Sequence, residues 1–453
     1  MFPNSRKWII FMVLACLILS ILPASQARAA DPLVFVVNST DDGVDFATNS
    51  VCSVGHITDG PCTLRAALSE AYYNLSGYEN VIINLDSDTY RLTIPPAIPN
   101  DINSGDLDIP NLTSVTTNKI TINTNDPNNR AVIDANGLDR VLRIGEGVNI
   151  RLENVVIRGG LLSLISETPE GAGILNWGKL ELHNVIIADN EARCAQEPCP
   201  YITGGGILNY GEVIMTSSTI LNNSSQAGSA IFNTLHVAPY SGKFVILNST
   251  IANNHASSGG TMINYGYMHL RNTTVSNNTA GGSVGILNYN NLVVESSTFA
   301  NAGPNASISN RKSGDIYFGA VTIKDSLLTA LPGLNSYNCS STAGTTWESS
   351  GYNIFTDSTC PSTGTGDLSN TDPKLGPLGD WGGLTMTRPL RAGSPAVNHR
   401  PDICTTIPYS PILPPENLLF DQRYIDRVDG MCDTGAFEGI AEAFDVFLPL
   451  VLK

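Results

Sequence analysis

Charged residues are scarce in this sequence, and basic residues are the scarcest among them. Asp, Glu, Lys and Arg make up 15% of the 453 residues, with 25 basic against 41 acidic side chains. Nucleic acids and anionic lipid surfaces are bound through clustered Lys and Arg, so the composition argues against both as partners. Long amphipathic helical patterns are also missing, whereas Gly, Asn, Ser and Thr are frequent. This combination predicts an all-β protein.

Long apolar runs are missing too, apart from one near the N-terminus. Residues 8–22 are apolar, follow the basic pair Arg6 and Lys7, and precede the small-x-small site Ala27-Arg28-Ala29. This order is typical of a signal peptide cleaved before Ala30. A retained anchor is the alternative, but a membrane span needs about 20 apolar residues. We therefore expect export to the cell surface or the medium. The mature chain should have no transmembrane span and 22 basic against 41 acidic residues.

Zinc-like spacings of Cys and His are absent, which makes metal ligation the weaker interpretation of the nine cysteines. Cys16 lies in the apolar run, and the remaining cysteines form an even set in an oxidising compartment, where disulfides are expected. The sequence leaves their connectivity open, but clustering along the chain favours local pairs. The pairs are Cys52–Cys62, Cys194–Cys199, Cys339–Cys360 and Cys404–Cys432. We expect no metal ion and no other cofactor.

The middle of the chain repeats a glycine-rich segment that ends in an asparagine. Its copies lie at residues 171–178, 204–211, 228–233, 259–266 and 285–289. The shortest spacing between copies is the 24 residues from Asn264 to Asn288, and longer spacings contain insertions. Self-similarity at such a period is the signature of a stacked repeat architecture.

Aligning the copies produces three columns of apolar residues. The columns are Ile174, Ile207, Ile231, Met262 and Ile286; Leu182, Met215, Ile246, Leu270 and Val294; and Ile187, Ile220, Ile251, Val275 and Phe299. Each column falls in a short alternating segment, which indicates three strands per coil, stacked about 4.8 Å apart around a shared interior. We predict a right-handed parallel β-helix over residues 105–335. A leucine-rich repeat is excluded because no helical segment recurs.

Asparagine recurs at two registers of the repeat. One column comprises Asn176, Asn209, Asn233, Asn264 and Asn288, and the other comprises Asp189, Asn222, Asn253, Asn277 and Asn301. Asn tolerates the left-handed backbone of tight turns, and stacked amides bond from coil to coil. We therefore interpret both columns as structural.

One helix is expected, between Cys52 and Tyr78. Thr63 is a suitable N-cap, and Leu64, Ala67, Leu68 and Ala71 form one apolar face. A short amphipathic helix at this place would close the open end of the coil stack, where strand edges are otherwise unpaired.

The two ends of the mature chain resemble modules of bacterial exported proteins. Residues 62–67, Cys-Thr-Leu-Arg-Ala-Ala, resemble the motif that names the CSLREA module, with Ala66 in place of the usual Glu. Residues 393–397, 421–423 and 432–438 resemble the choice-of-anchor Q domain. This resemblance implies an exported, pectin-lyase-like β-helix with a variable C-terminal attachment device, and it implies no reaction.

These observations divide the chain into five parts. They are a signal peptide (1–29), a CSLREA-like cap (30–104), the β-helix (105–335), a choice-of-anchor Q-like region (336–443) and an apolar tail (444–453). The tail is either a sorting signal or a last packed strand.

Clustered carboxylates, the usual requirement for polysaccharide cleavage, are missing from the outward columns of the repeat. These columns instead alternate charges between coils, as in Arg271 and Glu295, which is the pattern of stabilising cross-strand pairs. Asp106 and Asp108 share one strand face near the N-terminal end, and we assign them a structural role. No residue is therefore predicted to be catalytic.

Aromatic residues are few, at 7%, yet four of them follow the first asparagine column at one register. They are Trp177, Tyr210, Tyr265 and Tyr289, and Thr234 interrupts the series. Aromatic faces stack on sugar rings, so the column is a candidate glycan platform. The alternative is that the rings stack on one another and shield the asparagines.

Two hypotheses about function follow. The first is a non-enzymatic surface or secreted protein that contacts polysaccharide or neighbouring cells. The second is a polysaccharide lyase or glycoside hydrolase, which is supported by analogy with other β-helices alone.

Overall fold

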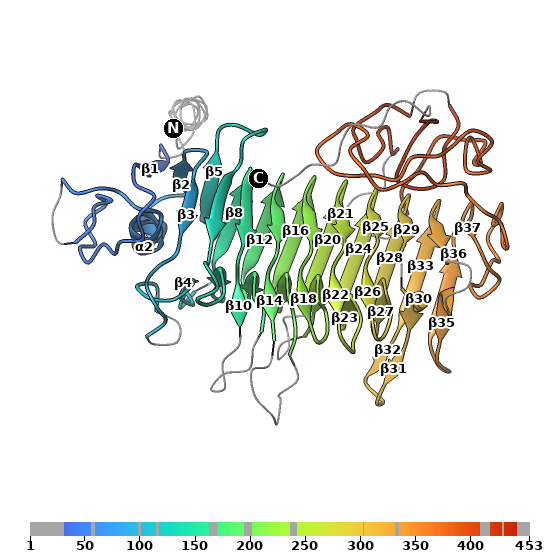
Figure 1. Cartoon of the computed structure of the whole chain (residues 1–453), viewed down its shortest axis with the longest axis horizontal. Coiled ribbons are helices and arrows are strands. Elements are labelled where there is room, and N and C mark those ends of the chain that lie inside the picture. The colour runs from blue at the N-terminus through green and yellow to red at the C-terminus, as the bar shows by residue number, and fades with distance from the viewer. Residues whose placement is uncertain are drawn as a thin grey trace, which may run out of the picture.

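The computed structural model describes residues 31–55, 59–97, 101–114, 117–162, 170–193, 202–235, 242–301, 303–330, 335–407, 417–427 and 430–441. Parallel strands stack in coils along one long axis, which confirms the predicted all-β parallel β-helix (Figure 1). The described part has one α-helix, α2 (Leu64–Asn74), followed by the short 3₁₀ helix η1 (Leu75–Gly77).

Three long parallel sheets form the sides of the coil stack. Sheet 1 contains β1 (Leu33–Val36), β2 (Asn80–Leu85), β5 (Lys119–Thr124), β8 (Asn149–Glu153), β12 (Lys179–His183), β16 (Glu212–Thr216), β20 (Lys243–Leu247), β24 (Tyr267–Arg271), β28 (Asn291–Glu295), β33 (Ala320–Lys324) and β36 (Thr346–Ser349). Sheet 2 contains β3 (Thr89–Arg91), β6 (Ala131–Asp134), β9 (Val155–Arg158), β13 (Ile186–Ala188), β17 (Thr219–Leu221), β21 (Thr250–Ala252), β25 (Thr274–Ser276), β29 (Thr298–Ala300), β34 (Leu327–Thr329) and β37 (Ile354–Phe355). Sheet 4 contains β4 (Leu107–Ile109), β7 (Leu142–Ile144), β11 (Ile174–Asn176), β15 (Ile207–Asn209), β19 (Ile231–Asn233), β23 (Met262–Asn264), β27 (Ile286–Asn288), β30 (Asn305–Asn310) and β35 (Ser336–Ser341).

Five coils carry a further, two-residue strand between sheets 2 and 4, which the repeat did not predict. These strands form sheet 3: β10 (Leu161–Leu162), β14 (Glu191–Ala192), β18 (Ser224–Ser225), β22 (His255–Ala256) and β26 (Thr279–Ala280). The only antiparallel pair among the named strands of the described residues is the hairpin of β31 (Lys312–Ser313) and β32 (Tyr317–Phe318).

The three predicted apolar columns are in register and point inward. Ile174 pairs with Ile207, Leu182 with Met215, and Ile187 with Ile220, and each series continues through the following coils. All of these side chains are buried. Because each coil buries its apolar residues against those of its neighbours, the interior is one continuous core.

The sheets extend beyond the predicted limits of 105 and 335. The strands β1, β2 and β3 precede residue 105, and β36 and β37 follow residue 335, yet all five belong to sheets 1 and 2. The cap and the C-terminal region are therefore joined to the coil stack without an intervening linker.

The predicted cap helix is confirmed. The Thr63 hydroxyl accepts a hydrogen bond from the Ala66 N–H (3.2 Å), and the apolar face of α2 is buried. Arg65 is buried as well; its Nε lies 2.6 Å from Asp42 Oδ1, and its guanidinium donates to backbone carbonyls that include Gly105 O (2.8 Å). The side chain of Ala66, where the resembled motif has Glu, is fully buried.

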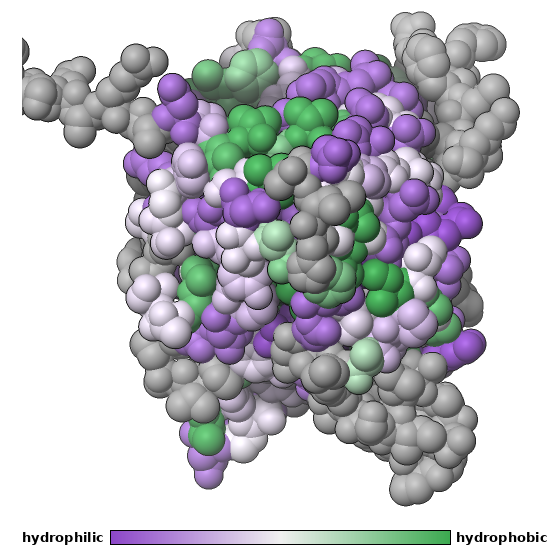
Figure 2. Space-filling model, turned by 90° about the vertical axis from the view of Figure 1, so that its left-hand side faces the viewer, coloured by the Kyte–Doolittle hydropathy of each residue, from purple (hydrophilic) through white to green (hydrophobic). Residues whose placement is uncertain are grey.

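The N-terminal end of the stack has apolar side chains on its surface as well as polar ones (Figure 2). Val36 is 62% exposed, Phe46 60% and Tyr73 52%. Strand β1 has one neighbour, β2, so it is the edge strand of sheet 1. The helix α2 covers the interior of the stack, whereas Val36 on β1 and Tyr73 at the C-terminal end of α2 stay exposed.

The C-terminal region folds back over the middle coils, on the side of sheet 2 (Figure 1). Gln422 accepts a hydrogen bond from the Thr274 hydroxyl (2.7 Å) and donates to Thr250 Oγ1 (3.0 Å). The Ala436 N–H donates to Thr298 Oγ1 (3.1 Å). The outward column of sheet 2 changes from Val and Ile to Thr over these coils, and the threonines supply polar partners for the docked region.

Three of the predicted disulfides are formed: Cys52–Cys62, Cys339–Cys360 and Cys404–Cys432. The predicted Cys194–Cys199 pair, the signal peptide and the apolar tail lie outside the described residues. Three disulfides fit an oxidising compartment. Among the residues with a described structure, no helix has the length and apolarity of a membrane span.

The first asparagine column forms an amide ladder inside the turn between sheets 4 and 1. Each side-chain amide donates to the next one at 2.8–3.0 Å, from Asn176 through Asn209, Asn233, Asn264 and Asn288 to Asn310. The side chains are buried. The structural interpretation of this column is confirmed.

The second column is structural as well, but mainly through its backbone geometry. Asp189, Asn222, Asn253 and Asn277 adopt the left-handed conformation, with φ between 55° and 57°. The amide ladder is formed instead by the residues that follow them, Asn190, Asn223, Asn254 and Asn278, and it ends on Asn301. The column thus supplies turn geometry, and its neighbour supplies the hydrogen bonds.

Candidate functional site

The four aromatic residues predicted as a glycan platform lie along one edge of the coil stack, at the turn between sheets 4 and 1. Each follows the buried asparagine that ends β11, β15, β23 or β27, and each is half-buried. The asparagine amide fixes the turn, so each of these aromatic side chains leaves the backbone at the equivalent position of its coil.

The rings form two separate stacked pairs. Trp177 and Tyr210 are parallel within 12°, with ring centroids 3.9 Å apart, and Tyr265 and Tyr289 are parallel within 5° at 4.4 Å. Within a pair, one face of each ring covers the other ring. Self-stacking, which was the alternative to a glycan platform, therefore occurs.

Two further aromatic side chains join the second pair. The ring of Phe232, an outward residue of β19 in the interrupted coil, lies 6.0 Å from that of Tyr265. Tyr317, from the hairpin β31–β32, meets Tyr265 edge-on at 5.2 Å. The repeat did not identify them, because Phe232 lies on the strand rather than at the aromatic register and Tyr317 belongs to an insertion.

The first pair is attached to a polar network. The Tyr210 hydroxyl donates to Glu170 Oε2 at 3.2 Å. Burial and the adjacent Glu170 carboxylate raise the pKa of Tyr210 well above its usual range, and burial raises the pKa of Glu170. Arg140 donates from Nε to the Gly171 carbonyl (3.0 Å) and from Nη1 to Asp106 Oδ2 (2.9 Å). Tyr210 is thus fixed at both the ring and the hydroxyl.

Asp106 and Asp108, the two carboxylates that share a strand face, are both buried, on the residue before β4 and on β4 itself. Their side chains are 4% and 5% exposed and lie beside Arg140 and Arg143, with Asp108 Oδ1 3.7 Å from Arg143 Nη1. Burial, and then the charge of Asp106, raise the pKa of Asp108 to about 8. Such enclosure fits the structural role assigned to this pair.

The protonation of Asp108 should make the free energy of unfolding of the native protein depend on pH. We expect the Asp108→Asn variant to lose this contribution. The Asp108 pKa is about 8 in the folded chain and ordinarily 3.8, so the folded state binds more protons than the unfolded state between these values. The stabilisation is complete below about pH 4 and is lost as the pH rises to about 8. The free energy of unfolding should fall by at least about 1.4 kcal/mol, the equivalent of one pKa unit, over this range.

Denaturant titrations from pH 4 to pH 8 measure this effect. Asp126→Asn, on an exposed turn, serves as the control and should keep the native pH profile. An Asp108→Asn variant whose profile matches the native one would show that Asp108 does not titrate in this range.

Sheet 1 contains the predicted cross-strand ion pair and extends it. Arg271 Nε lies 2.6 Å from Glu295 Oε1, His269 Nε2 lies 2.7 Å from the same oxygen, and the Ile407 N–H donates to Glu295 Oε2 at 2.6 Å. Burial would raise the pKa of Glu295, but its hydrogen bond to His269 and the charges around it outweigh burial and lower that pKa. Glu295 thus holds the C-terminal region against the coils.

Comparisons with known proteins returned no family model, no curated protein and no solved structure that matches this chain. The resemblance to CSLREA and choice-of-anchor Q proteins therefore stays a prediction. In the part of the chain with a described structure, no three His, Cys, Asp or Glu side chains are grouped as metal ligands.

Proposed function

We propose that this protein is exported and contacts polysaccharide at the cell surface or in the medium without cleaving it. The three disulfides and the N-terminal signal-peptide pattern support export. The excess of acidic residues argues against nucleic acid as the partner.

The aromatic edge is the observation that carries this proposal. Trp177, Tyr210, Tyr265 and Tyr289 are only half-buried, although an aromatic side chain gains most from complete burial. A row of partly exposed rings is the kind of surface that marks a binding site. Stacking restrains the rings, so a sugar that contacts them orders few additional side chains.

A polysaccharide lyase or hydrolase receives no comparable support. The carboxylates of Asp106 and Asp108 are buried, and the outward columns of sheet 1 combine basic, acidic and neutral residues. A polysaccharide panel distinguishes the two functions when it is read for binding and also for released reducing or unsaturated ends. Binding without release supports the proposal, and release contradicts it.

Replacement of Tyr210 or Trp177 by Ala tests the aromatic edge. We expect a loss of polysaccharide binding of about 1–2 kcal/mol per ring, inferred from aromatic pair energies. The melting temperature should fall as well, because either substitution breaks the stack of Trp177 and Tyr210. Tyr210→Phe keeps the ring and removes the bond to Glu170, so it should bind like the native protein. A lower melting temperature with unchanged binding in both Ala variants would make the rings purely structural.

A further inference from the structure

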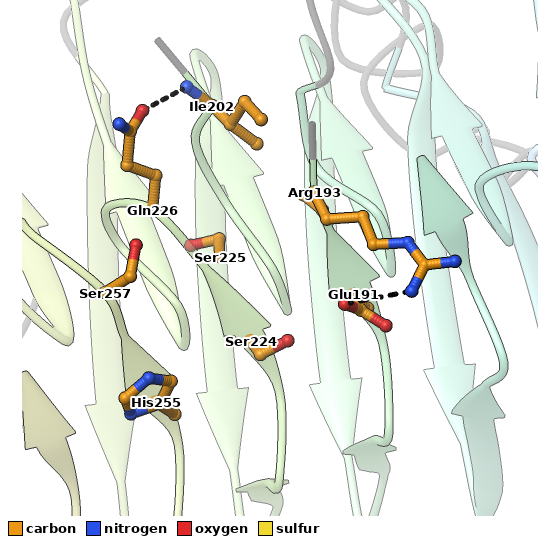
Figure 3. A pocket seen from close by; sticks show the side chains of 9 residues that line it. Glu191, Arg193, Ile202, Ser224, Ser225, Gln226, His255 and Ser257 are labelled. Atoms are coloured by element: carbon orange, nitrogen blue, oxygen red, sulfur yellow. Dashed lines mark hydrogen bonds and ion pairs between the residues drawn. The ribbon is translucent and has the colours of Figure 1, made fainter. Parts of the chain in front are cut away.

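A groove with a volume of about 270 Å³ crosses sheet 3, on strands β14, β18 and β22 (Figure 3). Outward side chains of the strands, Glu191, Ser224 and His255, lie along it, and Ile202, Gln226 and Ser257 border it from the adjoining turns. The volume is just below the about 300 Å³ at which small-molecule sites begin. The groove is therefore too small to enclose a typical ligand, and a ligand bound in it would project beyond its ends.

The groove repeats with the coils. Glu191 pairs in register with Ser224, and Ser224 with His255, so the three side chains occupy one column. Neighbouring strands are about 4.8 Å apart, and the column runs parallel to the axis of the stack. The site therefore suits an extended ligand with a repeating unit about as long as one coil step.

The backbone N–H groups of the strands in the groove are already hydrogen-bonded and cannot pair with a peptide strand. The Ser224 N–H donates to Asn190 O and the His255 N–H donates to Asn223 O, both at 2.9 Å, because every coil pairs with the next. Strand addition needs an unpaired sheet edge. A ligand of this groove must therefore be recognised by side chains.

These side chains carry no net fixed charge. Glu191 and Arg193 neutralise each other, with Oε1 and Nη1 3.7 Å apart. His255 Nδ1 lies 2.8 Å from Thr279 Oγ1. Gln226 Oε1 accepts a hydrogen bond from the Ile202 N–H at 3.1 Å.

Two hydroxyls are available to a ligand. Within the described part of the chain, the hydroxyls of Ser224 and Ser257 have no hydrogen-bond partner. Buried apolar side chains, among them Ile202, lie beside these polar groups. The serine hydroxyls can form hydrogen bonds with the hydroxyls of a sugar.

We propose that this groove binds an uncharged, extended oligosaccharide, with one sugar unit per coil along the axis of the stack. The inference rests on the proposed function for the class of partner, but it places binding on sheet 3 rather than on the aromatic edge.

Calorimetric titration of the full chain tests the groove. The probes are uncharged cello-, xylo-, manno- and malto-hexasaccharides, with hexagalacturonate as the charged comparison. We expect at least one uncharged hexasaccharide to bind, and to bind more tightly than hexagalacturonate. Ser224→Phe fills the groove and should weaken that binding more than about 10-fold. Ser224→Ala removes one neutral hydrogen bond and should weaken it about 2- to 10-fold.

Thr322→Phe is the matched control, because Thr322, like Ser224, is a half-buried, outward hydroxyl residue, but it lies on sheet 1. It should bind like the native protein. Ser224→Ala keeps the test decisive if the larger substitution impairs folding. The proposal is overturned if no uncharged hexasaccharide binds, if hexagalacturonate binds best, or if both Ser224 variants fold and bind like the native protein.

The aromatic variants separate this inference from the proposed function. If Tyr210→Ala loses polysaccharide binding while Ser224→Phe keeps it, the groove proposal is wrong and the aromatic edge is the contact surface. If Ser224→Phe loses binding and Tyr210→Ala keeps it, the groove is the binding site and the aromatic platform is wrong. Unchanged binding in both variants contradicts both proposals.

Discussion

Replacing Arg65 by Ala is expected to lower the free energy of unfolding by about 3–5 kcal/mol, the usual cost of breaking a buried ion pair. Asp42 would remain buried with its Arg partner gone, and the carbonyls of Ile102, Gly105 and Asp106 would lose the donors they share. The side chain of Arg65 connects α2 to the segment that leads into β4, so the substitution should open the cap.

Denaturant unfolding measures the loss, and amide hydrogen exchange locates it. Protection should fall in α2 and β4 while the middle coils keep theirs. Arg151→Ala is the matched control: Arg151 lies 3.0 Å from Glu153 and 3.5 Å from Glu181, but the three side chains are about one third exposed. Exposed pairs contribute about 0–1 kcal/mol. Equal losses in the two variants would contradict the assigned role of Arg65.

The coil architecture could be predicted because each coil contacts only its neighbours. Ile174, Leu182 and Ile187 recur at fixed positions since each stacks on its equivalent in the next coil, so alignment of the copies determines the register. The cap helix was predictable for a local reason as well, because Thr63 and the apolar face that follows lie within one helical segment.

Contacts between distant segments left no such pattern. Gln422 meets Thr274 across 148 residues of sequence, and neither residue belongs to a repeating pattern that includes the other. Strands β1 and β36 complete sheet 1 without the glycine-rich motif, so the repeat could not identify them. Sheet 3 was missed because a strand of two residues is too short to show alternation.

The candidate sites, too, were predictable only where residues recur in the repeat. The register of Trp177, Tyr210, Tyr265 and Tyr289 was visible in the sequence, but whether their rings face each other depends on side-chain geometry. The groove was not visible at all. Its column, from Glu191 through Ser224 to His255, conserves no residue type from coil to coil, and only the pairing of the strands brings these side chains into one row.

The asparagine ladder is expected to be the other large contribution to stability that a single substitution can remove. Asn264 lies in its middle: its Oδ1 accepts from Asn233 Nδ2 (2.8 Å) and from the Gly266 N–H (3.1 Å), and its Nδ2 donates to Asn288 Oδ1 (2.8 Å) and Asn291 O (3.0 Å). Leu has a similar size but can neither donate nor accept, so Asn264→Leu leaves several buried polar groups unpaired.

Each buried group without a partner costs about 1–3 kcal/mol, so Asn264→Leu should lower the free energy of unfolding by about 3 kcal/mol or more. Asn253→Gly is the control in the preceding coil, because Asn253 is exposed and its φ of 55° is a conformation that glycine adopts easily. We expect that variant to change stability by less than about 1 kcal/mol. Hydrogen exchange should show the loss of protection in Asn264→Leu spreading to β19 and β27, the two strands whose asparagines bond to Asn264. Loss confined to β23 would mean that the amides act one coil at a time and not as a connected ladder.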